Sequence, residues 1–328
     1  MNNLKNFNKK FQYNECICCK NTERQIISKV GRNFTKLTTV ICTGCGLVHS
    51  HPIPSKDELH NFYKRDYRVK YKSTLKPNKR HTLRYAKDSL DFIFEVTSYL
   101  DYQNYDQRKF LDLGSGSGEI SYFAKRLGFD VLGIEPNQGY AQFCIKDLEL
   151  NIINSTYEEA NINENEYDII NLNQVLEHLP DPLIVLNNLR KFLKNHGILV
   201  LTVPNIQAGI HSPRNRFHYA HIYNYNHLTL KKLFDKSNFK ILNPNTISTR
   251  IYAKKIEKSD NQINFNFKKN YEEINKILSS KSAYDHFFTA TPYKRFLKKM
   301  KQYPKEYFLS IFFKDHKSIL EYIFNKYN

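Results

Sequence analysis

Two cysteine pairs form the clearest metal-binding pattern in the chain. Cys16 and Cys19 belong to one Cys-x-x-Cys turn, and Cys42 and Cys45 belong to a second turn that follows after 22 residues. Each such turn directs two thiolates at one ion, so two turns complete the tetrahedral sulfur set that Zn²⁺ prefers. Because all four positions are then protein ligands, we predict a structural zinc ion rather than a catalytic one.

A glycine-rich turn is the second feature that could do chemistry. The apolar segment 109–113 runs into Gly114-Ser-Gly-Ser-Gly118, and Glu119 follows. The spacing departs from the G-x-G-x-x-G fingerprint of dinucleotide sites, and the adjacent acid favours a cationic sulfonium over a pyrophosphate. Glu135 lies 21 residues past Gly114, at the end of the next predicted strand. An acid at that position can accept hydrogen bonds from both ribose hydroxyls.

An alternation of strands and helices must position these groups. The predicted helices are 118–127, 138–148 and 183–194, and the predicted strands between and around them are 109–113, 130–135, 151–154, 167–173 and 197–204. Such alternation indicates an α/β, doubly wound and mostly parallel Rossmann-like sheet. A further helix at 229–237 and two strands within 239–252 complete the predicted sheet domain.

The segments that flank the sheet have their own signals. Residues 26–41 are typical of two short strands that turn near Gly31, which together with the cysteine turns predicts an N-terminal zinc ribbon. Ser55 and Glu58 have the spacing of a capping box at the start of a helix over 55–63, and residues 79–100 predict an amphipathic helix. Residues 253–328 are basic and aromatic-rich, with helical patches at 294–300 and 306–313.

Several of these motifs resemble a known family. The segments LDLGSGSG at 111–118, VLGIEP at 131–136, YDIINLNQVLEHLPDP at 167–182 and HIYNYNHLTLKKLFDKSNF at 221–239 are similar to class I S-adenosylmethionine-dependent methyltransferases. The ribbon and its tail resemble the zinc-binding N-terminus of a bacterial subset that methylates sugars in deoxysugar and surface-polysaccharide pathways. The resemblance spans residues 16–252 and therefore implies a methyltransferase with a structural Zn²⁺ ion.

The resemblance also implies residue roles and a division of the chain. The domains expected are a zinc ribbon (1–50), a linker and helical cap (51–108), an S-adenosylmethionine-binding domain (109–252) and a helical extension (253–328). Glu135 is expected at the ribose and Thr156 at the adenine. The methionine end is expected to contact Asp112, Gly114 and Gly116, and Asn173 and Gln174 are expected to border the methionine and the methyl group. Ser115 and Gly118 are expected to be cofactor-binding residues of the same loop.

Methyl transfer also needs a group that accepts the proton of the acceptor. A neutral imidazole suits this role at neutral pH, and His178 and His221 both fall in segments expected at the active-site mouth. We predict His178 first and His221 second as the catalytic base. Gln174 replaces the first acid of the E-x-x-E-H metal cluster found in some relatives, which leaves two ligands, Glu177 and His178, and predicts no catalytic metal.

Composition restricts the class of protein and its partners. The chain has 328 residues, 41% of them hydrophobic, without a membrane-spanning run or an export signal at its N-terminus, so we expect a cytoplasmic protein. The net charge is +18, with −6 over 109–204 and +14 over 205–328. Such basic flanks fit either an acidic partner or a solvated surface.

Four hypotheses follow from these features. The first is methyl transfer to a small acidic acceptor, with a nucleotide-linked or phosphorylated sugar of surface glycan as the leading candidate. The second is methylation of RNA or protein, and the third is a non-catalytic binding module on the same fold. The fourth is a peripheral membrane contact through 294–328, where core packing of Phe308, Leu309, Ile311, Phe312 and Phe313 is the favoured interpretation. The sequence leaves open which histidine is the base, whether oxygen, nitrogen or carbon is methylated, and the oligomeric state.

Overall fold

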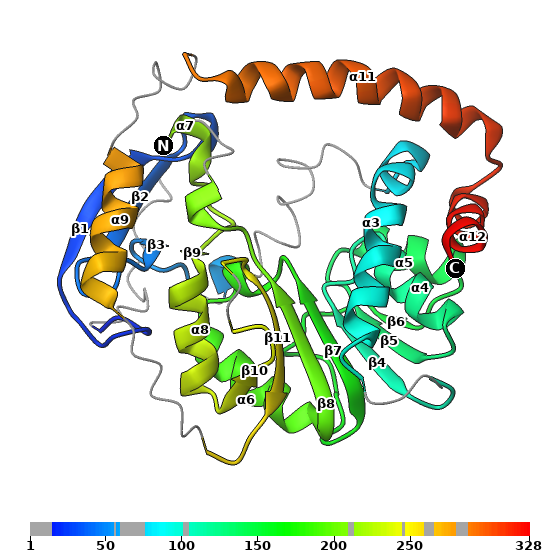
Figure 1. Ribbon diagram of the computed structural model, residues 1–328, viewed down its shortest axis with the longest axis horizontal. Coiled ribbons are helices and arrows are strands. Elements are labelled where there is room, and N and C mark those ends of the chain that lie inside the picture. The colour runs from blue at the N-terminus through cyan, green and yellow to red at the C-terminus, as the bar shows by residue number, and fades with distance from the viewer. Residues whose placement is uncertain are drawn as a thin grey trace, which may run out of the picture.

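A seven-stranded sheet lies at the centre of the molecule (Figure 1). The computed structural model describes residues 15–55, 57–59, 76–100, 105–208, 213–244, 247–258, 266–279 and 288–328. In spatial order the strands are β10 (Phe239–Ile241), β11 (Arg250–Lys255), β8 (Leu193–Thr202), β7 (Tyr167–Asn173), β4 (Lys109–Leu113), β5 (Asp130–Ile134) and β6 (Ile152–Ile153). The five strands from β8 to β6 are parallel, and β10 and β11 are antiparallel, so the predicted doubly wound α/β sheet is confirmed.

Helices cover both faces of this sheet (Figure 1). Because side chains alternate along a strand, Phe110 and Leu111 of β4 point to opposite faces and belong to different hydrophobic clusters. The cluster around Leu111 is shared with α6 (Pro182–Phe192) and α8 (His227–Lys236). The cluster around Phe110 is shared with α3 (Lys79–Thr97), α4 (Glu119–Arg126), α5 (Gln138–Lys146) and α12 (His316–Tyr327).

The N-terminal cysteines belong to a second, four-stranded sheet. Its order is β1 (Arg24–Val30), β2 (Lys36–Cys42), β3 (Val48–Ser50) and β9 (Tyr223–Asn224), and the short 3₁₀ helix η1 (Arg32–Phe34) forms the turn between β1 and β2. The two strands predicted over 26–41 are therefore confirmed. The edge strand β9 lies more than 170 residues after β3 in the sequence, and the sequence analysis did not predict this pairing. The ribbon is thus joined through β3 and β9 to the segment that contains His221.

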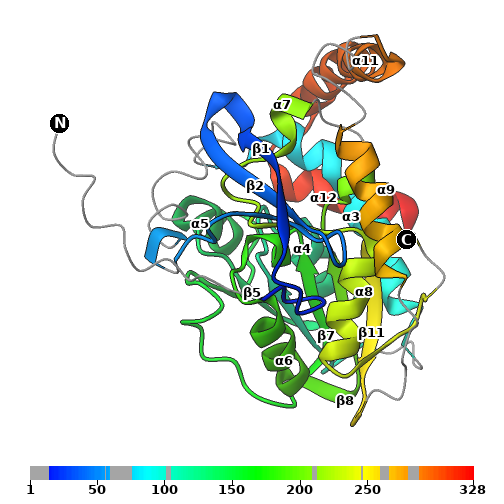
Figure 2. The same ribbon diagram turned by 90° about the vertical axis from the view of Figure 1, so that its left-hand side faces the viewer.

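The C-terminal helices differ from the prediction. In place of two patches at 294–300 and 306–313, one helix, α11 (Ala290–Phe312), continues through Pro304. Two further helices, α9 (Phe267–Ser279) and α12, were not predicted. The helix α9 packs against β2 of the ribbon through Ile274, whereas Leu320 and Phe324 of α12 lie in the cluster that contains α3 and α4. The extension therefore contacts the protein at two separate places, as the two views in Figures 1 and 2 show.

The segment between the ribbon and α3 is described only in part. The backbone N–H of Ser55 donates to the Glu58 carboxylate at 2.8 Å, and the backbone N–H of Glu58 donates to the Ser55 hydroxyl at 3.2 Å, so the capping box is confirmed. The rest of the predicted helix over 55–63 lies largely outside the described residues. The remaining short elements are α7 (Pro213–Arg216), η2 (Leu176–His178) and η3 (Ile206–Ala208). In the described parts of the chain, every helix is too short or too polar to cross a bilayer.

Candidate active site

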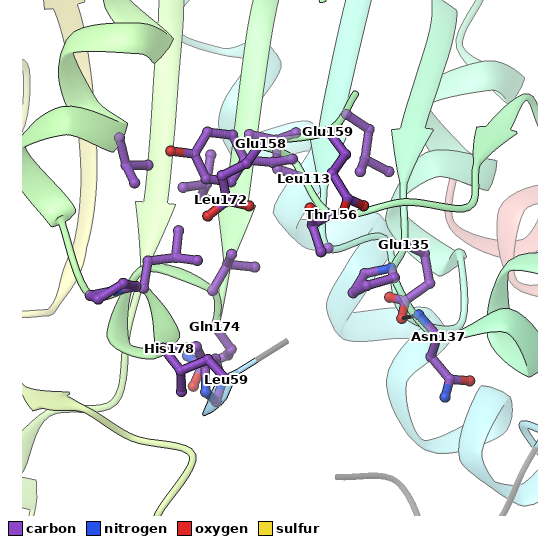
Figure 3. A pocket seen from close by; sticks show the side chains of 18 of the residues that line it. Leu59, Leu113, Glu135, Asn137, Thr156, Glu158, Glu159, Leu172, Gln174 and His178 are labelled. Carbon is purple, nitrogen blue, oxygen red and sulfur yellow. Dashed lines mark hydrogen bonds between the residues drawn. The ribbon is translucent and has the colours of Figure 1, made fainter. Parts of the chain in front are cut away.

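A cavity of about 540 Å³ opens at the carboxyl ends of β4, β5 and β7. This is the edge of a doubly wound sheet where ligands bind, and the volume is within the range of small-molecule pockets. Figure 3 shows Glu135 and Thr156 on one side of the cavity and Gln174 and His178 on the other. The cavity is lined by Asp57, Leu59, Leu113, Gly114, Ile134, Glu135, Pro136, Asn137, Thr156, Tyr157, Glu158, Glu159, Leu172, Gln174, Val175, His178, Leu179, Pro180 and Val185.

The glycine loop is held against the end of β5. The backbone N–H of Gly114 donates to the carbonyl of Ile134 at 2.8 Å, and Gly114 has a φ of 76°, in the left-handed region that glycine tolerates best. A Cβ atom at this position would lie 2.5 Å from Cγ2 of Val175. The third glycine, Gly118, is the N-cap of α4. The loop thus needs glycine at 114 for both backbone conformation and close packing against the wall of the cavity.

Glu135 lies beside this loop. Its side chain is buried, one carboxylate oxygen accepts a 2.9 Å hydrogen bond from the backbone N–H of Gly116, and the other accepts one of 2.9 Å from that of Asn137. Two backbone donors fix the carboxylate at the end of β5, where it lines the cavity. The acid and the glycine turn, which are distant in sequence, are therefore in direct contact.

Asp112 lies beneath the loop and outside the cavity. Its carboxylate accepts hydrogen bonds from the Ser121 hydroxyl at 2.5 Å and from the Asn171 amide at 2.7 Å. Burial raises the pKa of Asp112 to about 6, although these hydrogen bonds oppose the rise. The side chain thus connects β4, α4 and β7, and its contacts hold the loop in place.

The structure brings only some of the predicted residues to the cavity surface. Those that line it are Gly114, Glu135, Thr156, Gln174 and His178. Those outside the lining are Asp112, Ser115, Gly116, Gly118, Asn173 and His221. Gln174 has a φ of 60°, which is unusual for a residue with a side chain and directs the chain from β7 into η2.

Glu119, the acid next to the glycine turn that the sequence analysis expected near the cofactor, does not line the cavity. Glu119 is buried and its carboxylate accepts a 2.6 Å hydrogen bond from the Ser117 hydroxyl, so it does not face the cavity. Asp57, Glu158 and Glu159 join Glu135 in the lining instead. The sequence analysis missed these three. Sequence could have indicated Glu158 and Glu159, because they lie two and three residues after Thr156, which was expected at the adenine.

The second end of the cavity carries a cluster of one acid and two histidines. The carboxylate of Glu177 lies 3.6 Å from Nε2 of His178 and 3.8 Å from Nε2 of His221. Nδ1 of His178 donates to the carbonyl of Ala220 at 2.7 Å, because that oxygen can only accept. The neutral His178 ring therefore carries its proton on Nδ1 and keeps the lone pair of Nε2 for accepting a proton.

Glu177, the acid of this cluster, has no side-chain hydrogen bond among the described residues, whereas His178 has one. Its side chain is buried, and neither carboxylate oxygen has a hydrogen-bond partner among the described residues. Burial raises the pKa of Glu177 to about 8, so the carboxyl holds a proton at neutral pH. The protonated acid keeps a negative charge away from the two imidazoles.

The same cluster bears on the prediction that this position holds no catalytic metal, which assumed only two possible ligands. The potential ligand atoms of Glu177, His178 and His221 all lie within 4.8 Å of one another, and these residue types can ligate transition metals. The sequence argument counted only two ligands because His221 is distant along the chain. The fold supplies the third group, so the premise for excluding a metal at this position was incomplete.

The ribbon sheet positions His221. β9 begins two residues after His221, and its Tyr223 pairs with His49 of β3. The Tyr223 hydroxyl also donates to the carbonyl of Pro180 at 3.2 Å, in the loop that follows His178. The ribbon therefore contributes to the histidine end of the cavity through backbone pairing.

The four predicted zinc ligands lie together. The Sγ atoms of Cys16 and Cys45 are 3.6 Å apart, those of Cys19 and Cys42 are 3.5 Å apart, and all four lie within 4.8 Å of one another. A tetrahedral zinc site with bonds of about 2.3 Å has sulfur–sulfur edges of about 3.8 Å. The arrangement fits Zn²⁺, and hydrogen bonds from the three neighbouring thiols lower the pKa of Cys42.

Comparison with known proteins identifies the family. The sequence model of a family described as a methyltransferase domain matches residues 79–243, which is half of the chain. The chain belongs to this methyltransferase family. The matched range contains the glycine loop, Glu135 and the histidine cluster, and excludes the ribbon cysteines and the C-terminal helices.

Relatives and solved structures are more distant. Ubiquinone biosynthesis O-methyltransferases of Haemophilus ducreyi and Actinobacillus pleuropneumoniae are 32% and 29% identical over 108 residues, which is 30% of this chain and 46% of each relative. The chain thus spans about half the length of the curated relatives it matches. Magnesium protoporphyrin IX methyltransferase from Synechocystis, solved with bound SAH, aligns with 62% of this chain and all of its own, at 13% identity and a TM-score of 0.47. An S-adenosylmethionine-dependent methyltransferase from Listeria monocytogenes, described as putative, aligns with 52% of this chain and all of its own, at 16% identity and a TM-score of 0.41.

Proposed function

We propose that this protein transfers a methyl group from S-adenosylmethionine to a small acidic acceptor. The observation that carries the proposal is the contact between Glu135 and the glycine loop at the mouth of an open cavity in a methyltransferase-family domain. When bound, S-adenosylmethionine supplies an electrophilic methyl group on a positively charged sulfur. The carboxylates of Asp57, Glu135, Glu158 and Glu159 give the cavity the charge that suits such a cation.

We assign the cofactor-binding roles by position. Glu135 would accept the ribose hydroxyls, Thr156 would lie at the adenine, and Gly114 with Gln174 would border the methionine end. Asp112 would act indirectly, by holding the loop through Ser121 and Asn171. The ribbon and its Zn²⁺ ion would be structural, since four cysteines leave no open coordination position.

His178 is the proposed general base. It lines the cavity, and its Nδ1–H is fixed by the Ala220 carbonyl, so Nε2 is the ring nitrogen that would accept the proton of the acceptor. His221, the second candidate, lies outside the cavity lining, with its ring centroid 4.9 Å from that of His178. His221 would therefore tune His178 rather than contact the acceptor.

The acceptor we propose is a nucleotide-linked or phosphorylated sugar of surface glycan. The half-buried guanidinium of Arg216 supports an acidic acceptor, because it lies two residues before His218 and has no acidic partner among the described residues. The ring centroids of His218 and His221 are 3.8 Å apart, with the ring planes tilted by 46°. Arg216 therefore belongs to the chain segment that contacts the histidine cluster. The names of the curated relatives support oxygen as the methylated atom.

Calorimetric titration with S-adenosylhomocysteine tests the cofactor site. We expect binding by the wild-type protein, a loss on the order of tenfold to a hundredfold for Glu135→Gln, and no change for the exposed Glu164→Gln control. Absence of binding by the wild-type protein, with its melting transition intact, would refute the methyltransferase proposal.

Labelled cofactor and a fractionated lysate test the reaction. We expect label in small metabolites, lost for His178→Ala but retained for the exposed His196→Ala, with S-adenosylhomocysteine affinity unchanged in both. Arg216→Gln is expected to raise KM for a phosphorylated acceptor, whereas the exposed Arg80→Gln is not. Label in RNA or protein instead would contradict the proposed acceptor class but not the methyltransferase activity.

A further inference from the structure

The long helix α11 contacts the protein through its polar side. Glu306 is the buried residue of this helix, and its carboxylate forms an ion pair with the guanidinium of Arg84 on α3, with one hydrogen bond of 2.8 Å. Arg84 also lies 5.4 Å from the ring centroid of Tyr303. After the helix ends, the amine of Lys79 donates to the carbonyl of Phe313 at 2.8 Å. These contacts fix the C-terminal half of α11 beside α3, and Figure 1 shows the rest of the helix extending away from α3 along the top of the view.

An exposed apolar stripe runs along another side of the helix. At about 100° per residue, seven apolar side chains fall within about 120° of the helix circumference, and Glu306 lies about 140° from their centre. Each of the seven is more than half exposed; they are Tyr293, Phe296, Leu297, Met300, Tyr307, Phe308 and Ile311. The expected core packing of this segment is therefore wrong for Phe308 and Ile311, and also for Leu309 and Phe312, because the helix is anchored by its polar side.

A row of lysines follows one edge of the stripe. Lys294, Lys298, Lys301 and Lys305 are spaced by three or four residues, and all are exposed. Glu306 is the one acid in the helix sequence, and Arg84 already neutralises it. The exposed surface of α11 thus combines an apolar stripe with a lysine row that has no exposed acid on the same helix.

We propose that α11 docks on an anionic membrane surface, with the apolar stripe in the boundary between headgroups and acyl chains and the lysine row at the phosphates. Basic amphipathic helices bind lipid surfaces in this way. Charge favours this occupant over a second copy of the chain. Two stripes packed face to face would bring lysines together without an exposed acid on either helix to pair with them.

Co-sedimentation of the full chain with vesicles tests the proposal. We expect binding to phosphatidylcholine vesicles that contain phosphatidylglycerol, and much weaker binding to phosphatidylcholine alone. The stripe variant, Phe296→Ser with Met300→Ser and Ile311→Ser, is expected to lose more than an order of magnitude in affinity. A control that replaces the equally exposed Ile26, Ile184 and Ile247 by Ser is expected to bind as the wild type does.

The lysine row is tested in the same assay. The variant Lys298→Gln with Lys301→Gln and Lys305→Gln is expected to weaken binding on the order of a hundredfold at low ionic strength. A charge-matched control replaces three exposed lysines elsewhere, at Lys29, Lys240 and Lys268. Equal losses in this variant and its control would show that net charge alone drives the interaction and would overturn the assignment to α11.

A spectroscopic probe covers the case in which the stripe variant does not fold. The chain has no tryptophan, so Phe296→Trp provides a single reporter on the stripe and Ile247→Trp one on a distant exposed site. Anionic vesicles should shift the emission of the first to shorter wavelength and leave the second unchanged. The proposal is overturned if neither emission moves, if vesicles do not bind the wild type, or if the protein is a dimer that the stripe variant converts to a monomer.

Discussion

The two ends of the cavity are built in different ways. At the end that contains Glu135, the glycine loop, Glu135 and Thr156 follow three strand ends within one stretch of about fifty residues. At the other end, His178 meets His221 across contacts between distant segments, which include the pairing of β9 with the ribbon strand β3 and the hydrogen bond of His178 to Ala220. One end is therefore determined by local sequence, whereas the other depends on contacts between distant segments. This difference predicts that the two ends can be disabled separately.

Loss of zinc is expected to have the largest effect and to separate the two ends. In Cys42→Ser one of four ligands is removed, so we expect loss of bound zinc, local unfolding of the ribbon and loss of methyl transfer. Affinity for S-adenosylhomocysteine should persist, because Glu135 and the glycine loop are held by hydrogen bonds to each other and to the end of β5. Zinc content, calorimetry and label transfer check this. Cys18→Ala is the control, and loss of both activities together would contradict the separation.

The two ends of the cavity also differ in the pKa of a buried acid, so they should respond differently to pH. Asp112 has hydrogen-bond donors for both oxygens and a pKa of about 6, whereas Glu177 has no such donor among the described residues and a pKa of about 8. Between pH 4.5 and 8 the folded protein keeps a proton on Glu177 that the unfolded chain releases, so this group makes stability fall by about 1.4 kcal/mol per pH unit.

The variant Glu177→Gln removes that dependence. The neutral amide should make the free energy of unfolding at pH 8 higher than in the wild type by a few kcal/mol, and about equal below pH 4.5. Urea unfolding at several pH values measures this. His178 and His221 face the carboxyl and are present in both proteins, so the comparison changes only the side chain at position 177. Parallel curves would contradict the raised pKa.

A pair of glycine substitutions tests how tightly the loop is packed. Gly114→Ala places a methyl group 2.5 Å from Cγ2 of Val175, whereas a Cβ at Gly116 has no neighbour closer than 3.9 Å. Both positions have positive φ, so the backbone cost of about 1–2 kcal/mol is common to both and the difference reports the clash. We expect a larger loss of thermal stability for Gly114→Ala, with partial rescue by Val175→Ala. Equal losses of thermal stability in the two variants, without rescue by Val175→Ala, would show that Val175 moves to make room for the added methyl group.

The smallest expected effect concerns the joint between the extension and the ribbon. The buried amide of Asn270 donates to the carbonyl of Cys45 at 2.8 Å and accepts from the Asn226 amide at 2.6 Å. Asn270→Ala should cost about 1–3 kcal/mol, because it leaves two buried polar groups without this partner. Thermal unfolding measures the loss, and Lys268→Ala on the exposed side of α9 is the control. An unchanged melting temperature would show that α9 does not stabilise the ribbon.

The fold was more predictable than the site, and for a physical reason. The strands and helices of the sheet follow from local periodicity, and strand–helix alternation favours parallel strands with right-handed connections. The cysteine turns are also local, and their four sulfurs lie as the spacing predicts. By contrast, Glu119 fits the charge argument from sequence but turns away from the cavity, because the turn at the start of α4 directs it to Ser117.

The sequence by itself determined the strand–helix order, the four-cysteine set and the turn that brings Glu135 to the glycine loop, because each depends on short-range geometry. Only the tertiary structure decided that Glu177, His178 and His221 form one cluster, since strand pairing between β3 and β9 brings that segment into place. It also decided that α11 turns its apolar stripe outward. Periodicity defines the faces of a helix, but the partner that covers a face comes from elsewhere in the chain or from outside it.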